Sequence, residues 1–349
     1  MSLSSKEYRS SVILGVGSYV PDKILGNKEL SLKVDTSDKW IQTRTGITER
    51  RIASIDQPTS DLAYEAARNA IADAKIEIDQ IDLVIVATIT PDMAFPSTAC
   101  ILQHRLGLGK VACFDLEAAC SGFLYSLDVA DGMLSSGRYK CALVIGAEKM
   151  SSIMDWQDRT TCVLFGDGAG AVILSAEGKG PELLGFRSGA DGSNPTLLHQ
   201  PAGGSSKPAS KNTLANREHF LKMNGKEIFK SAVRVMEKAT RELIAAHGLE
   251  LSDVNHIIPH QANVRIVESM AHRLEIPLEK FFCNLDRHGN TSAASIPLAL
   301  DEAVRNDLFV HGELVVMVAF GAGLAAASTL AFVFAFGCLS PLHTAINPK

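Results

Sequence analysis

The sequence lacks the features that mark several large classes of protein. It has no dense run of basic residues, and 34 Lys and Arg against 39 Asp and Glu give a net charge of −5, so nucleic-acid binding is not favoured. No two of the seven cysteines have the CxxC spacing of a zinc or thioredoxin-type site. The N-terminus holds only a short apolar stretch, 12–16, which fits neither a secretory signal nor a transit peptide. We therefore expect a cytoplasmic protein.

One stretch is long enough to suggest a membrane span. Residues 314–339 contain no charged side chain, and that run exceeds the roughly 20 residues that cross a bilayer. The segment Phe320-Gly321-Ala322-Gly323 interrupts it, however, and the sequences VVMV and STLAFVF on either side are typical of strands. We interpret the run as two buried strands joined by a turn, and we expect no association with a membrane.

What the sequence does contain indicates a large soluble α/β protein. Its 349 residues correspond to two domains or one fused double module. Strand-like runs alternate with amphipathic helical segments, of which 62–74 and 229–246 are the clearest. Such alternation predicts a largely parallel sheet. The strand-like runs are SVILGVG, IDLVIVAT, KVACFDL, CALVIGA and GAVILS.

The chain also repeats its own pattern. Three pairs of segments match in the same order at an offset of about 170 residues: 70–88 with 243–261, 110–120 with 280–290, and 11–17 with 180–186. A constant offset and order favour a duplicated module over the loose echoes of any α/β protein. The boundary is expected in the turn 177–181, which gives halves of 1–177 and 178–349. The Gly/Ser/Lys-rich stretch 201–212 is expected to be an exposed loop of the second half.

Cys120 is the strongest candidate for a reactive group. It ends the strand-like run FDLEAA and precedes a helical pattern, which places its sulfur at the positive end of a helix dipole, where thiolate is favoured. The alternative, a small buried hydrophobe, fits Cys100, Cys141 and Cys162 better. At an offset of 170, Cys120 superposes on Asn290, so the two are expected to face each other from equivalent turns.

His260 lies just past the expected strand 254–258 of the second half, and we expect it to join Cys120 and Asn290 in one cleft at the strand ends. His256 and His260 do not form a helical zinc motif, because Ile257 and Pro259 occupy the intervening positions. No metal or other cofactor is expected. The glycine-rich segment 165–170 lacks the spacing of a phosphate or dinucleotide loop and is interpreted as a close-packed turn.

These residues stand in motifs that resemble those of the β-ketoacyl-acyl-carrier-protein synthase III family of the thiolase superfamily. The similarity runs from about residue 13 to residue 334. It is carried by DTSDKWIQTRTGITER (35–50), AFPSTAC (94–100), FDLEAACSGF (114–123), DRTTCVLFGDGAGAV (158–172), PHQAN (259–263) and DRHGNTSAAS (286–295). The resemblance implies two duplicated βαβαβαββ halves in a five-layered α-β-α-β-α sandwich.

The family loads an acyl group from acyl-CoA onto a cysteine and condenses it with malonyl-acyl-carrier protein as CO₂ leaves, initiating fatty acid biosynthesis. The resemblance implies Cys120 as nucleophile, and His260 with Asn290 as the donors that hold the thioester oxygen of malonate. An enolate needs such donors more than it needs a strong base. The backbone N–H groups of Cys120 and Ala322 are implied as the oxyanion hole. Glycine is usual at the second position, so the methyl group of Ala322 is expected to narrow the pocket.

The resemblance extends to binding surfaces. Trp40, Arg44 and Arg159 match positions that grip the adenine and phosphates of CoA. Lys230, Arg265 and Arg273 match the basic patch for the acidic carrier protein, and Phe95 matches a residue that closes the partner's acyl pocket across a homodimer. The pantetheine tunnel is implied to be lined by Gly225, Phe229 and Asn263.

The sequence alone leaves several functions open. The segment 325–327 reads Ala-Ala-Ala where the family often has Thr-Trp-Gly, and 335–349 extend past the usual end, so the preferred starter acyl group is open. A non-decarboxylating thiolase would need a second cysteine in the turn FGAGL, which has none. A papain-like hydrolase would not show the internal repeat. A related enzyme of secondary metabolism and a non-catalytic CoA-binding homologue are both compatible with the sequence.

Overall fold

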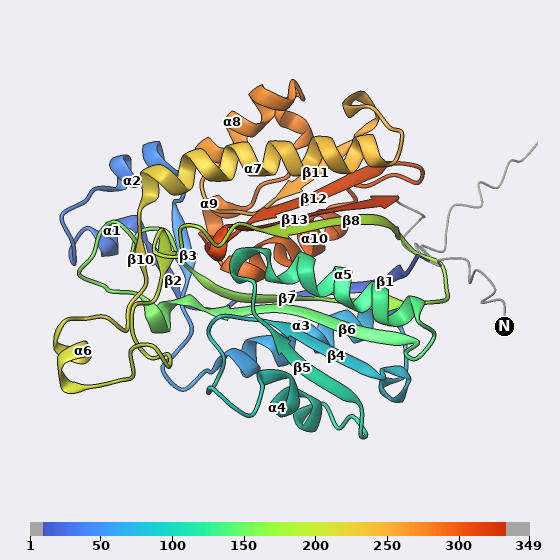
Figure 1. Ribbon diagram of the computed structural model, residues 1–349, viewed down its shortest axis with the longest axis horizontal. Coiled ribbons are helices and arrows are strands. Elements are labelled where there is room, and N and C mark those ends of the chain that lie inside the picture. Colours follow the sequence, from blue (N-terminus) through green and yellow to red (C-terminus); the bar gives the residue numbers. More distant parts are fainter. Residues whose placement is uncertain (1–9, 333–349) are drawn as a thin grey trace, which may run out of the picture.

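The computed structural model describes residues 10–332, which fold into five alternating layers of helices and sheets (Figure 1). One outer layer holds α7 (Gly225–Ala246) and α8 (Val264–Leu274), and the other holds α3 (Thr59–Ala74) and α4 (Thr98–Arg105). The central layer consists of α5 (Gly122–Ser135) and α10 (Ser295–Arg305), which lie between the two halves of the sheet. The expected five-layered thiolase-like sandwich is therefore confirmed.

The two halves of the sheet come from different parts of the chain. The first half contains β1 (Val12–Tyr19), β4 (Leu83–Ala87), β5 (Ala112–Leu116), β6 (Cys141–Lys149) and β7 (Asp167–Ser175). The second half contains β8 (Glu182–Ala190), β11 (His256–Pro259), β12 (Leu314–Phe320) and β13 (Ala325–Phe332). The predicted boundary at 177–181 falls in the bend between β7 and β8.

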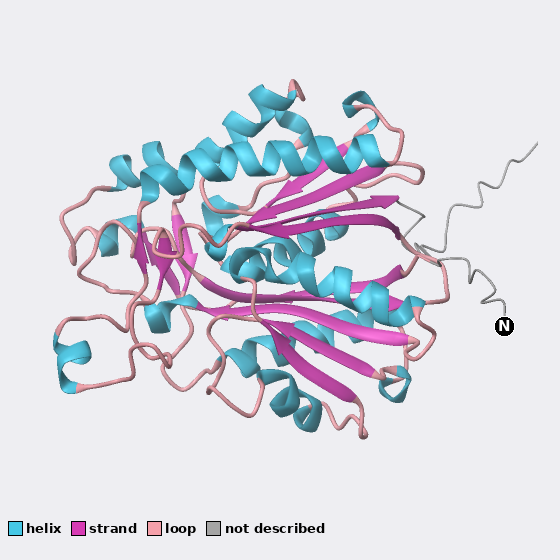
Figure 2. Cartoon of the chain, viewed as in Figure 1, coloured by secondary structure: helices cyan, strands magenta, loops and turns pink. Residues whose placement is uncertain are grey.

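Smaller elements cover the edge of the sandwich near the N-terminus of α7 (Figure 2). They are β2 (Ile24–Gly26), α1 (Asn27–Leu30), α2 (Asp38–Thr45), β3 (Glu49–Arg51), β9 (Leu198–His199), α6 (Lys211–Ala215), β10 (Lys222–Met223) and α9 (Leu285–His288). Short 3-10 turns precede the two central helices: η2 (Ala119–Ser121) before α5 and η6 (Ser292–Ala294) before α10. The expected loop 201–212 is largely exposed, although α6 begins within it.

The expectation of a largely parallel sheet is wrong. Within residues 10–332 the strand order is β11-β12-β13-β8-β1-β7-β6-β4-β5, and only β4–β5, β4–β6 and β11–β12 pair in parallel. The neighbours β6–β7, β1–β7, β12–β13 and β13–β8 are antiparallel, and β1 touches β8 through one pair, Val12–Glu182. Parallel pairing needs a crossover helix, and none lies between β6 and β7 or between β12 and β13.

The repeat is less complete than the internal sequence match predicts. The segment 280–290, which matches β5 and its following turn in sequence, forms only two isolated parallel bridges, Ile257–Phe281 and Phe165–Asn290, with α9 between them. The glycine-rich segment 165–170 is not a turn throughout, because β7 begins at Asp167. A Cβ at Gly170 would lie 2.7 Å from the backbone of Leu298, so the glycine lets α10 pack directly on β7.

The expected superposition of Cys120 on Asn290 also needs correction. Ala119 and Ser292 each begin the 3-10 turn before a central helix, and both adopt left-handed backbone, with φ of 47° and 50°. Cys120 therefore corresponds to Ala293, and Asn290 lies in the chain just before its turn. The sequence offset is shifted because the matching segment contains α9 in place of a strand.

The uncharged run beginning at residue 314 forms two strands, as predicted, within the described part of the chain. β12 and β13 pair in antiparallel register from Leu314–Phe332 to Phe320–Ala326. No helix within residues 10–332 is long and apolar enough to cross a membrane. The rest of the run lies outside the described residues.

Candidate active site

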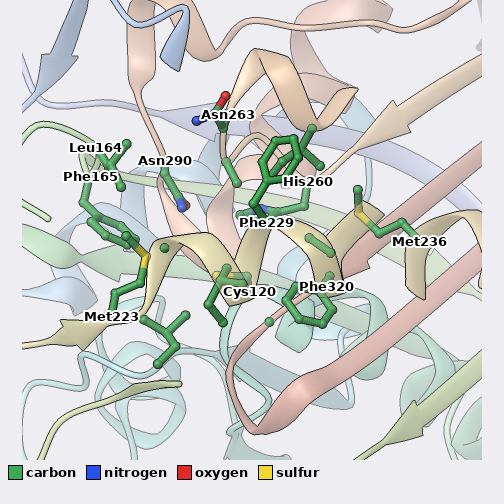
Figure 3. A pocket seen from close by; sticks show the side chains of 17 residues that line it. Cys120, Leu164, Phe165, Met223, Phe229, Met236, His260, Asn263, Asn290 and Phe320 are labelled. Carbon is green, nitrogen blue, oxygen red and sulfur yellow. The ribbon is translucent and has the colours of Figure 1, made fainter. Parts of the chain in front are cut away.

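Cys120, His260 and Asn290 line one narrow cavity of about 130 Å³ between the two halves of the sandwich (Figure 3). All three are buried, with 6%, 4% and 6% of their surface exposed. The other lining residues are mostly apolar: Leu164, Phe165, Leu198, Met223, Gly225, Ile228, Phe229, Ala232, Met236, Ala262, Asn263, Ile266, Phe320 and Gly321. The structure therefore brings the three predicted groups together in one cavity with mostly apolar walls.

Cys120 lies in the 3-10 turn η2, between the end of β5 and the start of α5. Burial raises the pKa of its thiol to about 12, and the negative charge of Glu148 acts in the same direction, whereas a hydrogen bond with Ser292 lowers it. The sequence predicts a thiolate favoured by the helix N-terminus, but desolvation outweighs that effect here. The sulfur is therefore a thiol at neutral pH, and its proton must leave during any nucleophilic attack.

His260 follows β11 directly, as the sequence predicts, and its ring orientation is fixed by Ser295. The distance from Nδ1 to the Ser295 Oγ is 2.7 Å, and the same Oγ accepts a hydrogen bond from the backbone N–H of Gln261 at 3.4 Å. Ser295 Oγ accepts from Gln261 and shares a second hydrogen bond with Nδ1. When the hydroxyl donates to Nδ1, the ring proton lies on Nε2. Burial lowers the pKa of His260 to about 4, so the ring is neutral at physiological pH.

Asn290 is held by its backbone and by its side-chain oxygen. Its N–H donates to the Leu164 carbonyl at 2.8 Å, and its carbonyl accepts from the N–H of Gly166 at 3.0 Å. The side-chain Oδ1 accepts from the N–H of Ser292 at 2.8 Å. A backbone N–H can only donate, so the amide oxygen must face it and the NH₂ group is left for the cavity.

The turn after β12 packs tightly on the nucleophile. A Cβ at Gly321 would lie 2.8 Å from the backbone nitrogen of Cys120, so only glycine permits this approach without displacement. Gly321 donates its own N–H to the Ala325 carbonyl at 2.8 Å. Ala322, the expected second oxyanion donor, is the next residue, at the start of a 3-10 turn.

Two departures from the family pattern lie outside the cavity lining. Ala322, whose methyl group the resemblance suggests could narrow the pocket, is not among the residues that line it. The segment 325–327 is absent from the lining as well. Ala326 instead borders a separate surface hollow beside Arg187 and Arg234, on the side of α7 away from Cys120.

Three buried polar residues around the predicted groups are not foreseen from the sequence: Ser292 and Ser295, which bond to Asn290 and His260, and Glu148, which bonds to Ser292. Each is fully or almost fully buried, with at most 1% of its surface exposed. Glu148 carries a recognisable signal, because it is a charged residue in the otherwise apolar strand CALVIGAEK. The two serines give no such signal, since their role depends on which groups fold against them.

The residues expected to bind CoA divide into two groups. Gly225, Phe229 and Asn263 line the cavity with Cys120. Trp40 and Arg159 lie outside it, stacked on each other with the guanidinium carbon 5.6 Å from the indole ring centre. Asn263 links the groups, because its Nδ2 donates to the backbone carbonyl of Arg44, on the same helix as Trp40, at 3.0 Å.

The expected docking residues are all exposed and lie on the adjacent helices α7 and α8. Arg265 lies over the ring of Phe229, which lines the cavity, with the guanidinium carbon 5.9 Å from the ring centre. Lys230 pairs with Glu227 at 3.1 Å, and Arg273 pairs with Glu237.

Phe95 lies on the opposite side of the sandwich, in the loop before α4, and 84% of its surface is exposed. It does not line the cavity of this chain. Nearby, β5 is the last strand of its sheet within the described residues, so one of its edges is unpaired.

Comparisons with known proteins agree with this geometry. Residues 114–192 match the sequence profile of 3-oxoacyl-[acyl-carrier-protein] synthase III, and residues 244–332 match the C-terminal profile of the same family. The first region contains Cys120, and the second contains His260 and Asn290.

Whole-chain relatives extend the match. The β-ketoacyl-[acyl-carrier-protein] synthase III of Caldanaerobacter subterraneus is 52% identical over 318 residues, which cover 91% of this chain and 96% of that protein. The crystal structure of the synthase III from Aquifex aeolicus has a TM-score of 0.85 at 46% identity, over 92% of this chain and 99% of that one. The Thermus thermophilus structure has a TM-score of 0.86 at 43% identity, over 93% and 100%. The chain therefore belongs to the β-ketoacyl-[acyl-carrier-protein] synthase III family.

Proposed function

We propose that this protein catalyses the decarboxylating condensation of an acyl-CoA starter with malonyl-acyl-carrier protein, through an acyl-Cys120 intermediate, to give a 3-oxoacyl-acyl-carrier protein. The product initiates fatty acid biosynthesis. One observation carries the proposal: a buried thiol shares a cavity with two N–H donors whose remaining polar atoms are already engaged, at Ser295 for His260 and at Ser292 for Asn290.

In the first half-reaction, the Cys120 sulfur attacks the thioester carbonyl carbon and the CoA thiol leaves. The tetrahedral intermediate carries a negative oxygen, which backbone N–H groups stabilise; each such donor contributes about 3 kcal/mol. The N–H groups of Cys120 and Ala322 are proposed for this role. Their support is the close packing of Gly321, the residue before Ala322, on the backbone of Cys120.

In the second half-reaction, malonyl loses CO₂ and its thioester becomes an enolate, whose carbon attacks the acyl carbonyl carbon on Cys120. The bond from that carbon to the Cys120 sulfur then breaks, and the sulfur leaves with the electron pair and is protonated back to the thiol. Nε2–H of His260 and the NH₂ group of Asn290 donate to the enolate oxygen. Both donors are uncharged, and the surrounding cavity is apolar, which strengthens hydrogen bonds to a developing charge.

Acyl-CoA enters past the N-terminus of α7, with its pantetheine along Gly225, Phe229 and Asn263 and its adenine against Trp40 and Arg159. The indole offers a stacking face, and arginine binds phosphate oxygens in pairs. Arg44 supplies a further cation from the helix of Trp40. The hydrogen bond from Asn263 to that helix supports a continuous path from the surface to Cys120.

The carrier protein docks on Lys230, Arg265 and Arg273, which are exposed on the adjacent helices α7 and α8, with Arg265 over the cavity-lining ring of Phe229. Such a basic patch on a chain of net charge −5 steers an acidic partner to one face. A homodimer is proposed from the exposure of Phe95 and the open edge of β5, both of which a second copy can cover.

The test is to incubate the protein with a panel of acyl-CoAs and to weigh the acyl-enzyme by intact mass spectrometry. We expect one acyl group per chain, located on the peptide that contains Cys120, and none in Cys120→Ser. The panel also gives the starter length. An adduct on another residue, or the same adduct in Cys120→Ser, would refute the assignment.

A further inference from the structure

Two cysteines outside the cavity lie with their sulfur atoms in contact. Cys100 is in the first turn of α4 and Cys113 is in β5, and their Sγ atoms are 3.4 Å apart. Both residues are half-buried, whereas Cys141 and Cys162 are buried. The helix α4 packs against β5 (Figure 1). The sulfurs of a disulfide are about 2 Å apart, so this pair is close to the geometry of one.

The two elements that carry these cysteines are already fastened together. The carboxylate of Asp115 accepts hydrogen bonds from the backbone N–H groups of Thr98 at 2.7 Å and Ala99 at 2.8 Å, at the start of α4. Asp115 and Cys113 point to the same face of β5, because alternate residues of a strand do. The carboxylate therefore holds Cys100 beside Cys113, and the two side chains need little movement to join.

The sulfur of Cys100 is the better nucleophile of the two. Burial raises the pKa of the Cys113 thiol to about 11, and the contact with Cys100 and the charge of Asp115 act in the same direction. Cys113 therefore keeps its proton at neutral pH, and Cys100 is the sulfur that attacks an oxidant first. A partly exposed thiol with a second thiol in contact is the arrangement of redox-sensitive sites.

We propose that Cys100 and Cys113 form a reversible disulfide on reaction with a hydroperoxide, and that this pair is oxidised before Cys120. The nucleophile of the proposed condensation is 6% exposed and lies in the cavity, whereas the pair is half-buried and lies outside it. Disulfides in reducing compartments are transient, and redox-sensing pairs are their usual form.

The reaction balances with one hydroperoxide per pair. The Cys100 sulfur attacks the terminal peroxide oxygen, the O–O bond breaks, and the departing alkoxide or hydroxide takes the proton of the Cys100 thiol. Cys100 is then a sulfenic acid. The Cys113 sulfur attacks the Cys100 sulfur, the S–O bond breaks, and the departing hydroxide takes the proton of the Cys113 thiol. With hydrogen peroxide, two thiols give one disulfide and two waters.

The pair lies at the edge that the proposed homodimer covers. One edge of β5 is unpaired within the described residues, and Phe95 lies in the loop that leads into α4. Cys113 packs in the cluster under α4 with Leu102 and Leu106, so a second copy that pairs with the strand edge does not displace its side chain. Oxidation of the pair fastens α4 to the edge strand and leaves the cavity residues unmodified.

The test uses the full-length protein in its native assembly. Reduced protein receives one equivalent of hydrogen peroxide at neutral pH. The remaining thiols are blocked with N-ethylmaleimide in denaturant before digestion and mass spectrometry without reductant. Trypsin cleaves after Arg105, between Cys100 and Cys113, and a glutamate-specific protease cleaves after Glu117, which puts Cys120 on a separate peptide. We expect the peptides of Cys100 and Cys113 to be linked and Cys120 to carry maleimide.

Two substitutions separate the roles of the sulfurs. Cys113→Ser should leave Cys100 as a sulfenic acid, which dimedone labels, because the second thiol is missing. Cys100→Ser should slow the loss of thiols by at least about 10-fold, since the protonated Cys113 is a poor nucleophile. Dithiothreitol should restore both thiols of the wild type. Cys162→Ala removes a buried thiol from a different core cluster and is the matched control, which should form the disulfide as the wild type does.

Three results would overturn the proposal: a disulfide to any other cysteine, a disulfide between two copies, and oxidation of Cys120 ahead of the pair. An unchanged thiol count after excess peroxide would overturn it as well. None of these measurements depends on acyl transfer, so their failure and the failure of the proposed function are distinguishable.

Discussion

The turns before the two central helices share one backbone form and carry different chemistry. Each begins with a left-handed residue, Ala119 in one and Ser292 in the other, and each continues into a buried helix. The first presents the sulfur of Cys120 to the cavity. The second presents Ala293 at the corresponding place, while Ser292 and Ser295 hold Asn290 and His260. The comparison shows that two turns of the same backbone form have different roles: the first carries the reactive sulfur, and the second, with the start of α10, orients Asn290 and His260.

The largest effect should come from the groups that the second turn orients. His260→Ala and Asn290→Ala should each reduce condensation by about 10²- to 10³-fold, the cost of one donor to a developing oxyanion, and leave acylation of Cys120 within a few-fold. Malonyl decarboxylation and acyl-enzyme mass are measured separately. Asn290→Asp is the matched control, since it keeps the shape and loses the donor. Loss of acylation in all three would mean that the two turns do not divide the reaction.

The buried carboxyl of Glu148, which bonds to Ser292 of the second turn, should cost stability. The folded-state pKa of Glu148, about 7, lies above its ordinary value of 4.5, so folding favours the protonated form. Its contribution to stability is complete below pH 4.5 and is lost as the pH rises through 7. Glu148→Gln should therefore be more stable than wild type at pH 8, by up to about 3 kcal/mol, with a smaller difference at pH 5. Denaturant midpoints at both pH values test this, and a variant less stable at pH 8 would contradict it.

Removing the hydroxyl of Ser295 should have a smaller effect, because it frees the ring of His260 without removing a donor. We expect Ser295→Ala to slow decarboxylation about 5- to 10-fold, as one hydrogen bond contributes about 1 kcal/mol. Ser295→Thr, which retains the hydroxyl, should recover most of the rate. Acylation should not change in either variant. If Ser295→Ala equals His260→Ala, the serine does more than fix the tautomer.

The smallest effect is expected at Ala322. Its side chain does not line the cavity, and glycine has the same N–H, so Ala322→Gly should change acylation by less than about twofold. Steady-state rates with acetyl-CoA and with longer acyl-CoAs would detect a change in starter preference. A clear change would show that the methyl group shapes the reacting turn after all.

The sequence predicts the positions of most strands and helices and the residues that meet in the cavity. Cys120, His260 and Asn290 each follow a recognisable local pattern, and the motifs around them are long. The antiparallel neighbours are not predicted, because the pairing of β7 with β1 and β6 depends on contacts far apart in the chain. The segment around Phe281 resembles a full strand in sequence but forms only an isolated bridge, because strand formation also depends on contacts far apart in the chain.

The residues that hydrogen-bond to the reacting groups cannot be predicted from local sequence patterns. Ser292 and Ser295 stand in NTSAAS among other small residues, and nothing in that segment distinguishes a serine that bonds to an imidazole from one that only fills space. Glu148 lies more than a hundred residues from Ser292, and their contact exists only once both halves have folded. The sequence predicts a lowered pKa for Cys120 because it shows the helix N-terminus but not the burial of the thiol, which raises the pKa.

The threefold contact of Ser292 limits how this protein can evolve or be engineered. One small side chain and its amide serve a thiol, a carboxyl and a carboxamide at once. A substitution at this position cannot retune one of them while sparing the others. Libraries aimed at new starter substrates should therefore keep position 292 constant and vary the apolar residues of α7 that line the cavity.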